Sequence, residues 1–288
     1  MPSEHTSTVS HDAIELGAHL DVRKMPAHWL MARLGKRVLR PGGLETTHWL
    51  LDRAAITSTD DVIEVAPGLG RTAAVILSRG PHSYVGIERD ASAAHLAERA
   101  LAGAGRAAGA TRIVHANAST VPLPDGSASL LVGEAMLSMQ TTTTKQAIMH
   151  EAHRLLRAGG RYVIHELAIT PETIDPALAA RIQADMSSTI HVGVRIGTVR
   201  EWRSWLEQAG FTVEQTTTAP MHLLEPGRLV RDEGAVGATR FLCNVLRTRG
   251  ATSRLRAVRG VFRQYRDHLC AVGFIARRTD STPTADAG

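Results

Sequence analysis

The chain has 288 residues, of which 43% are hydrophobic and 21% are charged, so it can bury a substantial core and is not a disordered chain. Its formal net charge of +5 suggests a nucleic-acid partner, but aromatic residues make up only 4% and offer little material for stacking on bases. The positive charge is also local, because residues 228–278 contain 12 arginines against three carboxylates.

The first 56 residues are expected to form a helical cap. Apolar side chains recur at helical spacing between residues 12 and 39, which predicts two short helices. The run Arg40-Pro41-Gly42-Gly43 then interrupts the pattern, and residues 44–56 carry the apolar stripe of a third helix. We interpret this segment as a cap on the domain that follows rather than as a separate domain.

Residues 57–278 are expected to form one α/β domain. Strands are predicted at 62–66, 83–87, 112–115, 129–133 and 162–168, and helices between them at 72–77, 91–107 and 145–156. Short, continuous apolar runs that alternate with helices are typical of a doubly wound, mostly parallel sheet that is covered on both faces.

Beyond residue 170 the alternation loosens, and two helical insertions flank a sixth strand. The expected elements are an insertion at 171–196, an amphipathic helix at 200–208, a strand at 211–217, an insertion at 222–267 that is basic and helical from residue 228, and a seventh strand at 268–276. Residues 279–288 are typical of a disordered tail.

The most informative segment joins the strand at 62–66 to the helix at 72–77. Its turn, Gly68-x-Gly70, lets a ligand approach bare backbone, as in a dinucleotide site. Glu64 lies near the tip of the strand, where a carboxylate would repel a pyrophosphate but attract an ammonium or a sulfonium group. A nicotinamide-dependent dehydrogenase is therefore a minor alternative.

This turn resembles the first motif of the class I S-adenosylmethionine-dependent methyltransferases, in which an acidic residue precedes small residues and Gly-x-Gly. Glu64, Ala66, Gly68 and Gly70 match the motif, and Ala66 stands where many members have a glycine. One methyl group at that position still permits close approach of a ligand.

Further segments resemble the same family, in the same order. Glu88 ends the second strand, 18 residues after Gly70, where the family binds both ribose hydroxyls. Asn117 follows the third strand where Asp is usual, so its contact with the adenine amino group loses charge assistance. Glu134 ends the fourth strand, near the sulfonium end of the cofactor, and residues 155–164 match the helix, Gly-Gly turn and fifth strand of the family.

The resemblance implies a Rossmann-like methyltransferase fold that binds S-adenosyl-L-methionine and releases S-adenosyl-L-homocysteine, and it implies no metal. The sequence is most similar in style to the small-molecule group that includes the ubiquinone and menaquinone methyltransferases. The residues expected to bind the cofactor are Glu64, Ala66, Pro67, Gly68, Gly70, Glu88, Arg89, Asn117, Ala118, Glu134 and Ala135.

Methyl transfer mainly requires that the acceptor be held in line with the methyl group, with a base where a proton must leave. In doubly wound sheets ligands lie at the carboxyl ends of the strands. We therefore expect His165 or Glu166, late in the fifth strand, or His191, in the first insertion, to accept that proton or orient the acceptor. The expected acceptor is a small, uncharged or apolar molecule with an O, S or C nucleophile, such as a phenol, a quinone or a thiol.

Two other functions remain open. A nucleic-acid methyltransferase fits the charge, but the Asn/Asp-Pro-Pro-aromatic motif of enzymes that act on amino groups is replaced by Gly133-Glu134-Ala135-Met136, so no nucleic-acid partner is expected. A non-catalytic protein that keeps the cofactor fold is the second. The apolar and arginine stripes of residues 228–267 would allow weak contact with an anionic membrane surface.

A cytoplasmic location is expected for this chain. Its N-terminus is polar, no apolar run approaches the roughly 20 residues of a membrane span, and two cysteines form no disulfide framework. The oligomeric state is left open by the sequence.

Overall fold

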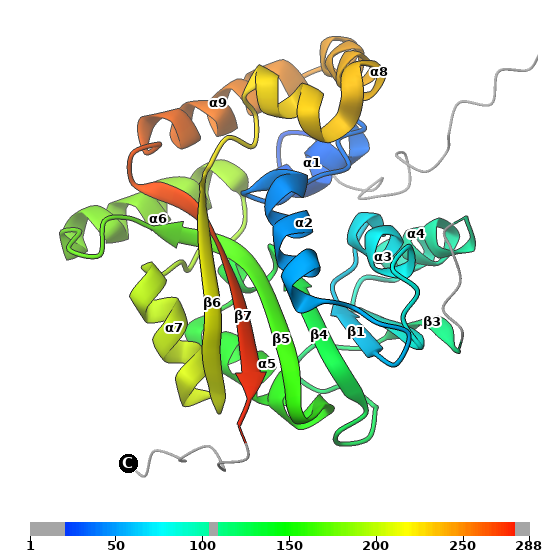
Figure 1. The fold of residues 1–288 in the computed structure, drawn as a ribbon. Coiled ribbons are helices and arrows are strands. Elements are labelled where there is room, and N and C mark those ends of the chain that lie inside the picture. Colours follow the sequence, from blue (N-terminus) through cyan, green and yellow to red (C-terminus); the bar gives the residue numbers. More distant parts are fainter. Residues whose placement is uncertain (1–20, 104–108, 280–288) are drawn as a thin grey trace, which may run out of the picture.

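The computed structural model describes residues 21–103 and 109–279, which form a seven-stranded sheet flanked by helices (Figure 1). The first of the two helices expected between residues 12 and 39 begins outside these residues. The tail expected at 279–288 lies outside them from residue 280 onward.

The sheet has the expected doubly wound architecture. Its strands are β1 (Asp61–Val65), β2 (Ser83–Glu88), β3 (Thr111–His115), β4 (Ala128–Glu134), β5 (Leu156–Ile169), β6 (Phe211–Pro220) and β7 (Leu269–Arg278). Their order is β3-β2-β1-β4-β5-β7-β6. Among these described strands, β7 is antiparallel to both of its neighbours, β5 and β6, and the other neighbouring pairs are parallel. The mostly parallel sheet of seven strands is therefore confirmed, and β1 and β4 flank its topological switch point.

The last three strands are longer than the sequence predicted. β5 begins at Leu156, six residues before the predicted start, and β6 and β7 pair from Phe211 with Arg278 to Pro220 with Cys270. Pairing of backbones extends the ladder past the apolar run, because hydrogen bonds between strands do not require apolar side chains. Much of β6 is polar and exposed, so apolar periodicity did not reveal its full length.

Helices cover both faces of the sheet and its carboxyl end. They are α1 (Ala27–Arg33), α2 (Gly43–Ala54), α3 (Arg71–Leu77), α4 (Ala91–Ala102), α5 (Thr142–Leu155), α6 (Pro176–Ile190), α7 (Val199–Gln208), α8 (Pro226–Arg247) and α9 (Ala251–Gln264). Leu130 and Val132 of β4 pack in the core beneath α2, α3 and α4, and Leu131 packs in the core beneath α5 and α7. Successive side chains of a strand point to opposite faces, so the middle of this strand, Leu130 to Val132, is continuously apolar.

A third group of helices gathers beyond the carboxyl end of β5 (Figure 1). Side chains of α1, α6, α8 and α9 share one hydrophobic cluster with Leu167, Ile169 and Leu269 at the ends of β5 and β7. The described part of the cap and both insertions therefore build a common roof over this end of the sheet.

The basic insertion consists of two helices rather than one continuous segment. α8 leaves helical geometry at Gly234, where φ is 72° and ψ is 168°, and α9 starts after Gly250, which is left-handed with φ 85°. Leu255, Val258 and Phe262 form the apolar stripe of α9, and each is at most 9% exposed. This stripe is packed within the roof, whereas Val230, Val236, Leu242 and Leu246 of α8 are exposed, and weak contact of the segment with a membrane surface stays a prediction.

Within residues 21–103 and 109–279, no helix is long and apolar enough to cross a membrane.

Candidate functional site

A pocket of about 530 Å³ lies at the carboxyl ends of β1, β2 and β4, beside the topological switch point. We call it the strand-end pocket. The turn between β1 and α3 forms one side of it, and His28 and Trp29 of α1 with Phe262 of α9 close it from the roof. Ten of the eleven residues expected to bind the cofactor line this pocket, and Gly70 does not. The structure brings the ten together, while their binding of the cofactor stays a prediction.

The glycine turn uses left-handed backbone at three positions. Ala66, Gly68 and Gly70 have φ values of 55°, 53° and 69°. A Cβ on Gly70 would lie 2.7 Å from the Cβ of Ala100, so this glycine allows α3 and α4 to approach each other instead of facing the pocket. A Cβ on Gly68 would have no neighbour nearer than 3.9 Å, which leaves bare backbone open to a ligand.

The left-handed backbone of Ala66 is unusual for a residue with a side chain and was not predicted from the sequence. Left-handed backbone costs a residue with a Cβ roughly 1–2 kcal/mol. The N–H of Ala66 donates to the carbonyl of Ile87 at 2.8 Å, so pairing with β2 holds the strained residue in place.

The carboxylate of Glu88 is held by backbone donors at the end of β2. Its Oε1 accepts from the N–H groups of Arg89 and Asp90 at 2.8 and 3.1 Å, and its Oε2 accepts from that of Gly68 at 3.3 Å. Glu88 is 8% exposed and lines the strand-end pocket. A carboxylate has about four lone-pair sites and these bonds occupy both of those on Oε1, so Oε2 can still accept from a ligand hydroxyl.

Asn117 lines the pocket, but its amide oxygen is engaged. The Oδ1 atom accepts from the backbone N–H and from the hydroxyl of Ser119, both at 3.1 Å. Asn commonly closes such a local turn with a residue two positions ahead. The predicted contact between this oxygen and an adenine amino group would have to replace at least one of these bonds.

Glu64 is a buried carboxyl group at the floor of the pocket. It is 4% exposed, and Tyr84 donates its hydroxyl to Oε2 at 2.6 Å. Burial raises the pKa of Glu64 to about 8, and the nearby Glu134 adds to the increase. Glu64 is therefore protonated at neutral pH, and a cationic ligand beside it would favour the ionised form.

Glu134, at the end of β4, is the most heavily coordinated acid of the site. The Arg40 guanidinium and the Thr72 hydroxyl donate to its Oε2, and Thr47 and His165 reach its Oε1 at 2.6 and 2.8 Å. Burial acts to raise the pKa of Glu134, but Arg40, His165 and Thr47 outweigh it and hold the pKa at about 2. This carboxylate is therefore ionised and oriented before any ligand binds.

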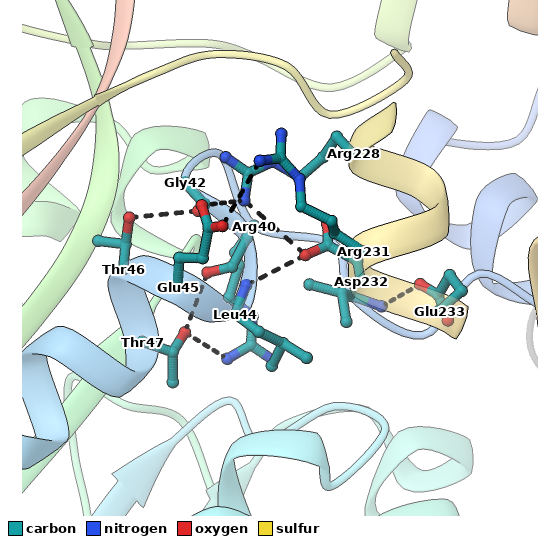
Figure 2. Close-up of polar contacts among 12 residues, drawn as sticks. Arg40, Gly42, Leu44, Glu45, Thr46, Thr47, Arg228, Arg231, Asp232 and Glu233 are labelled. Atoms are coloured by element: carbon teal, nitrogen blue, oxygen red, sulfur yellow. Dashed lines mark hydrogen bonds and ion pairs between the residues drawn. The ribbon is translucent and has the colours of Figure 1, made fainter. Parts of the chain in front are cut away.

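Arg40 was not among the predicted site residues, although its turn was recognised in the cap. It is 7% exposed and lines the strand-end pocket, and its position within a Pro-Gly-Gly turn was the available signal. Figure 2 shows how this turn is tied to α8. The N–H of Leu44 donates to Asp232 at 3.2 Å, and the buried ammonium of Lys36 lies 3.5 Å from Glu233. The arginine is therefore carried on a segment that the basic insertion holds in place.

His165 does not line the pocket, although its position in β5 was predicted to be functional. The side chain is fully buried, with Nδ1 bonded to Glu134 and Nε2 accepting from the N–H of Gly42 at 3.1 Å. Both ring nitrogens are therefore used within the fold, Nδ1 toward β4 and Nε2 toward the cap. The prediction that His165 accepts a proton from the acceptor is not supported by this geometry.

Glu166 serves the turn after β4 instead of the pocket. It is fully buried, and it accepts four hydrogen bonds from Met136, Leu137 and Ser138 at 2.6 to 3.0 Å. Burial raises the pKa of Glu166, and these donors oppose the increase. Its oxygens face the turn that they hold, which corrects the expectation that Glu166 contacts the acceptor.

His191 lies away from the pocket as well. It ends α6 with left-handed backbone, φ 57°, and its exposed ring contacts the carbonyl of Lys24 at 3.2 Å. His28 is the histidine that lines the strand-end pocket, and burial lowers its pKa to about 4. A neutral imidazole therefore faces the pocket at physiological pH, where it can orient an acceptor by hydrogen bonding.

Metal chemistry has no evident centre in the described part of the chain. Within it, no three or more His, Cys, Asp and Glu side chains are grouped as ligands of a metal ion.

Comparison with known proteins gives the same picture of the fold. A family model described as "Methyltransferase domain" matches residues 63–164. An uncharacterised protein of Haemophilus influenzae strain Rd is 28% identical over 252 residues, which cover 86% of this chain and 95% of that protein. All eleven residues expected to bind the cofactor lie within the range matched by the family model.

Solved structures with the same fold are more distant in sequence. The MccD protein has a TM-score of 0.66 and 18% identity, with 84% of this chain and 100% of that chain covered. Geranyl diphosphate methyltransferase in complex with GPP and sinefungin has a TM-score of 0.60 and 16% identity, with 82% and 78% covered. At such identities the likeness shows the fold alone.

Proposed function

We propose that the chain is a class I S-adenosylmethionine-dependent methyltransferase that moves the methyl group to an O, S or C nucleophile of a small-molecule acceptor. One observation carries this proposal: ten predicted cofactor residues and a roof of α1 and α9 line the same pocket of about 530 Å³. Such a volume lies within the usual range for small-molecule sites.

The residues of the strand-end pocket fit S-adenosylmethionine. Gly68 offers open backbone, and Glu88 offers an oriented carboxylate suited to a ribose hydroxyl. Glu64 provides a carboxyl group that would ionise beside the positive charge of the cofactor. We propose that the N–H of Ala118 meets the adenine ring, since the amide oxygen of Asn117 is engaged by Ser119.

When bound, S-adenosylmethionine supplies an electrophilic methyl group on sulfur. The chain contributes mainly by positioning, because holding the reacting atoms in line accounts for much of the acceleration of such a transfer. Arg40, Thr47 and Thr72 keep Glu134 ionised at the end of β4, where its negative charge would favour a nearby cation. The apolar side chains of α1 exclude water from the same space.

The roof supports a small acceptor. His28, Trp29 and Phe262 approach the pocket from helices outside the sheet, and they leave a bounded space beside the predicted cofactor residues. The geranyl diphosphate methyltransferase that shares this fold was solved with GPP, which is a small molecule. We propose that acceptor and cofactor occupy the two ends of the strand-end pocket.

Calorimetric titration with S-adenosylhomocysteine tests the cofactor site. We expect saturable binding by the intact chain and a loss of about tenfold or more for Glu88→Gln, which removes one charged acceptor of hydrogen bonds. Glu98→Gln is the matched control, because Glu98 is an exposed carboxylate on α4 that does not line the pocket. Equal affinity of both variants would refute the assignment of Glu88.

Methyl-labelled S-adenosylmethionine tests the acceptor class. The enzyme is incubated separately with low-molecular-mass metabolites, RNA and protein from a cell extract, and the label in each fraction is measured. We expect transfer into the metabolite fraction, with the wild-type rate depending on enzyme concentration. Transfer into RNA alone would overturn the small-molecule proposal, and cofactor binding with no transfer to any fraction would favour a non-catalytic protein.

A further inference from the structure

A second pocket, of about 340 Å³, lies between the segment after β6, the start of α8 and the end of α9. Its distinctive feature is its lining of arginines, namely Arg228, Arg231, Arg259, Arg263 and Arg266. Among the described residues that line it, Glu225 is the single carboxylate. We call this space the arginine pocket.

Glu225 compensates only part of the positive charge. It accepts from Arg259 at 2.9 and 3.3 Å and lies 3.5 Å from Arg263. Its hydrogen bonds with Arg259 chiefly lower the pKa of Glu225, so the carboxylate is ionised at neutral pH. One negative charge then faces five guanidinium groups, which leaves an excess of positive charge in a concave space.

Of the other carboxylates near these arginines, Asp232 is buried and lies 4.0 Å from Arg228, whereas Glu45 and Asp267 are exposed to solvent. Glu45 is 3.0 Å from Arg228 and 3.6 Å from Arg231 (Figure 2), but its side chain is 63% exposed. Asp267 is 3.6 Å from Arg266 and 83% exposed. Exposed ion pairs contribute about 0–1 kcal/mol, so Arg231 and Arg266 can exchange these partners for a ligand at small cost.

Arg228 lines the arginine pocket and, within the described part of the chain, keeps one donor unpaired. Its side chain is 4% exposed, and its Nε atom is buried without a hydrogen-bond partner among the described residues. An unpaired buried donor costs about 1–3 kcal/mol, more where the group is charged. A phosphate in the pocket has enough oxygens for several guanidinium groups at once.

The arginine pocket adjoins the strand-end pocket. Leu223 and Phe262 line both spaces, so the two share an apolar wall. We propose that the arginine pocket binds the phosphate or diphosphate group of the methyl acceptor, while the apolar part of that molecule passes Leu223 and Phe262 into the strand-end pocket. This inference rests on the proposed function and names its substrate class, a soluble phosphorylated amphiphile, in place of the uncharged acceptor expected from sequence.

Inorganic pyrophosphate is the probe of this proposal. Its affinity is measured by calorimetry at constant ionic strength for the intact chain and for the double variant Arg231→Gln/Arg263→Gln, which removes two arginines that are 58% and 59% exposed. The matched control is Arg240→Gln/Arg256→Gln, which removes one exposed arginine from each of the same two helices outside the pocket. Both variants change the net charge equally.

We expect saturable binding by the wild type, about tenfold weaker binding by the pocket variant and less than twofold change in the control. S-adenosylhomocysteine should bind all three proteins alike. Cofactor binding without any pyrophosphate binding, or equal weakening in both variants, would overturn the arginine pocket and leave the proposed function intact, whereas loss of cofactor binding by the wild type would overturn the proposed function itself.

A phosphate could also belong to a lipid headgroup, so vesicles of anionic phospholipid form a second arm of the experiment. We expect the wild-type protein to stay in the supernatant on sedimentation. Sedimentation with the vesicles that is lost in Arg231→Gln/Arg263→Gln and kept in the control would overturn the assignment to a soluble acceptor.

Discussion

Replacing Arg40 tests how the cap is joined to the sheet. The side chains of Arg40 and Glu134 are 9% and 8% exposed, and their ion pair joins the turn before α2 to the end of β4. Arg40→Gln would leave the carboxylate of Glu134 buried without its opposite charge. Removing one partner of a buried pair commonly costs about 3–5 kcal/mol, and we expect a loss in this range in the free energy of unfolding. Urea denaturation followed by circular dichroism measures it.

Arg79→Gln is the matched control, because Arg79 donates to Asp52 at 2.6 Å and that aspartate is 65% exposed. Breaking this surface pair should cost about 0–1 kcal/mol. The double variant Arg40→Gln/Glu134→Gln should recover part of the loss, since no uncompensated charge is then buried. Equal losses for Arg40→Gln and Arg79→Gln, or no recovery in the double variant, would refute the buried pair as the attachment of the cap.

The loss of unfolding free energy caused by Arg40→Gln should depend on pH. Arg40, with His165 and Thr47, holds the pKa of Glu134 at about 2 against an ordinary value of 4.5. The stabilisation is fully present above about pH 4.5 and is lost as the pH falls towards 2. The difference in unfolding free energy between wild type and Arg40→Gln should therefore be largest near neutral pH and smaller at pH 3.

Three further predictions concern stability. Gly70→Ala should lower the free energy of unfolding, measured by urea denaturation, by about 1–3 kcal/mol more than Gly80→Ala. Both glycines have positive φ, but only a Cβ at Gly70 would meet a neighbour, at 2.7 Å. Equal losses would contradict the close approach of α3 and α4. Burial raises the pKa of Glu64 from 4.5 to about 8, so its stabilising effect is fully present below pH 4.5 and is lost as the pH rises towards 8. Urea melts of Glu64→Gln should show a flatter decline of stability over that window, and an unchanged decline would assign it to other groups. Ser138→Ala removes a 2.6 Å donor from a buried carboxylate and should lower the free energy of unfolding by about 1–3 kcal/mol, whereas Ser78→Ala, whose hydroxyl bonds a carbonyl at an exposed site, should be nearly neutral.

The contacts between α8 and the cap limit how the roof could open to admit a ligand. Glu233 accepts from the N–H groups of Arg37 and Val38 at 2.9 Å, and the next residue, Gly234, interrupts α8. The first part of α8 is thus fastened to the cap, while the chain leaves helical geometry immediately after the attachment. Any opening of the roof would have to break these hydrogen bonds or turn at Gly234.

The cofactor half of the site could be predicted from the sequence because its signals are local. Glu64, the glycine turn and Glu88 lie at the ends of neighbouring strands, and parallel pairing of β1 with β2 brings them to one edge whatever the roof contains. The hydrogen bond to the amide oxygen of Asn117 could also have been predicted from the sequence, because its donor Ser119 is two residues away.

Tertiary structure alone decided the roles of the acids and histidines. The partner of Glu134 is Arg40, 94 residues earlier, and the donors to Glu166 lie 28 to 30 residues earlier. The arginine pocket likewise joins the first turns of α8 to the last turns of α9. A sequence shows which residues can ionise or donate a hydrogen bond. Whether such a residue faces a ligand or is used within the fold depends on its burial and on distant partners. These are fixed by packing, which decides desolvation and pairing.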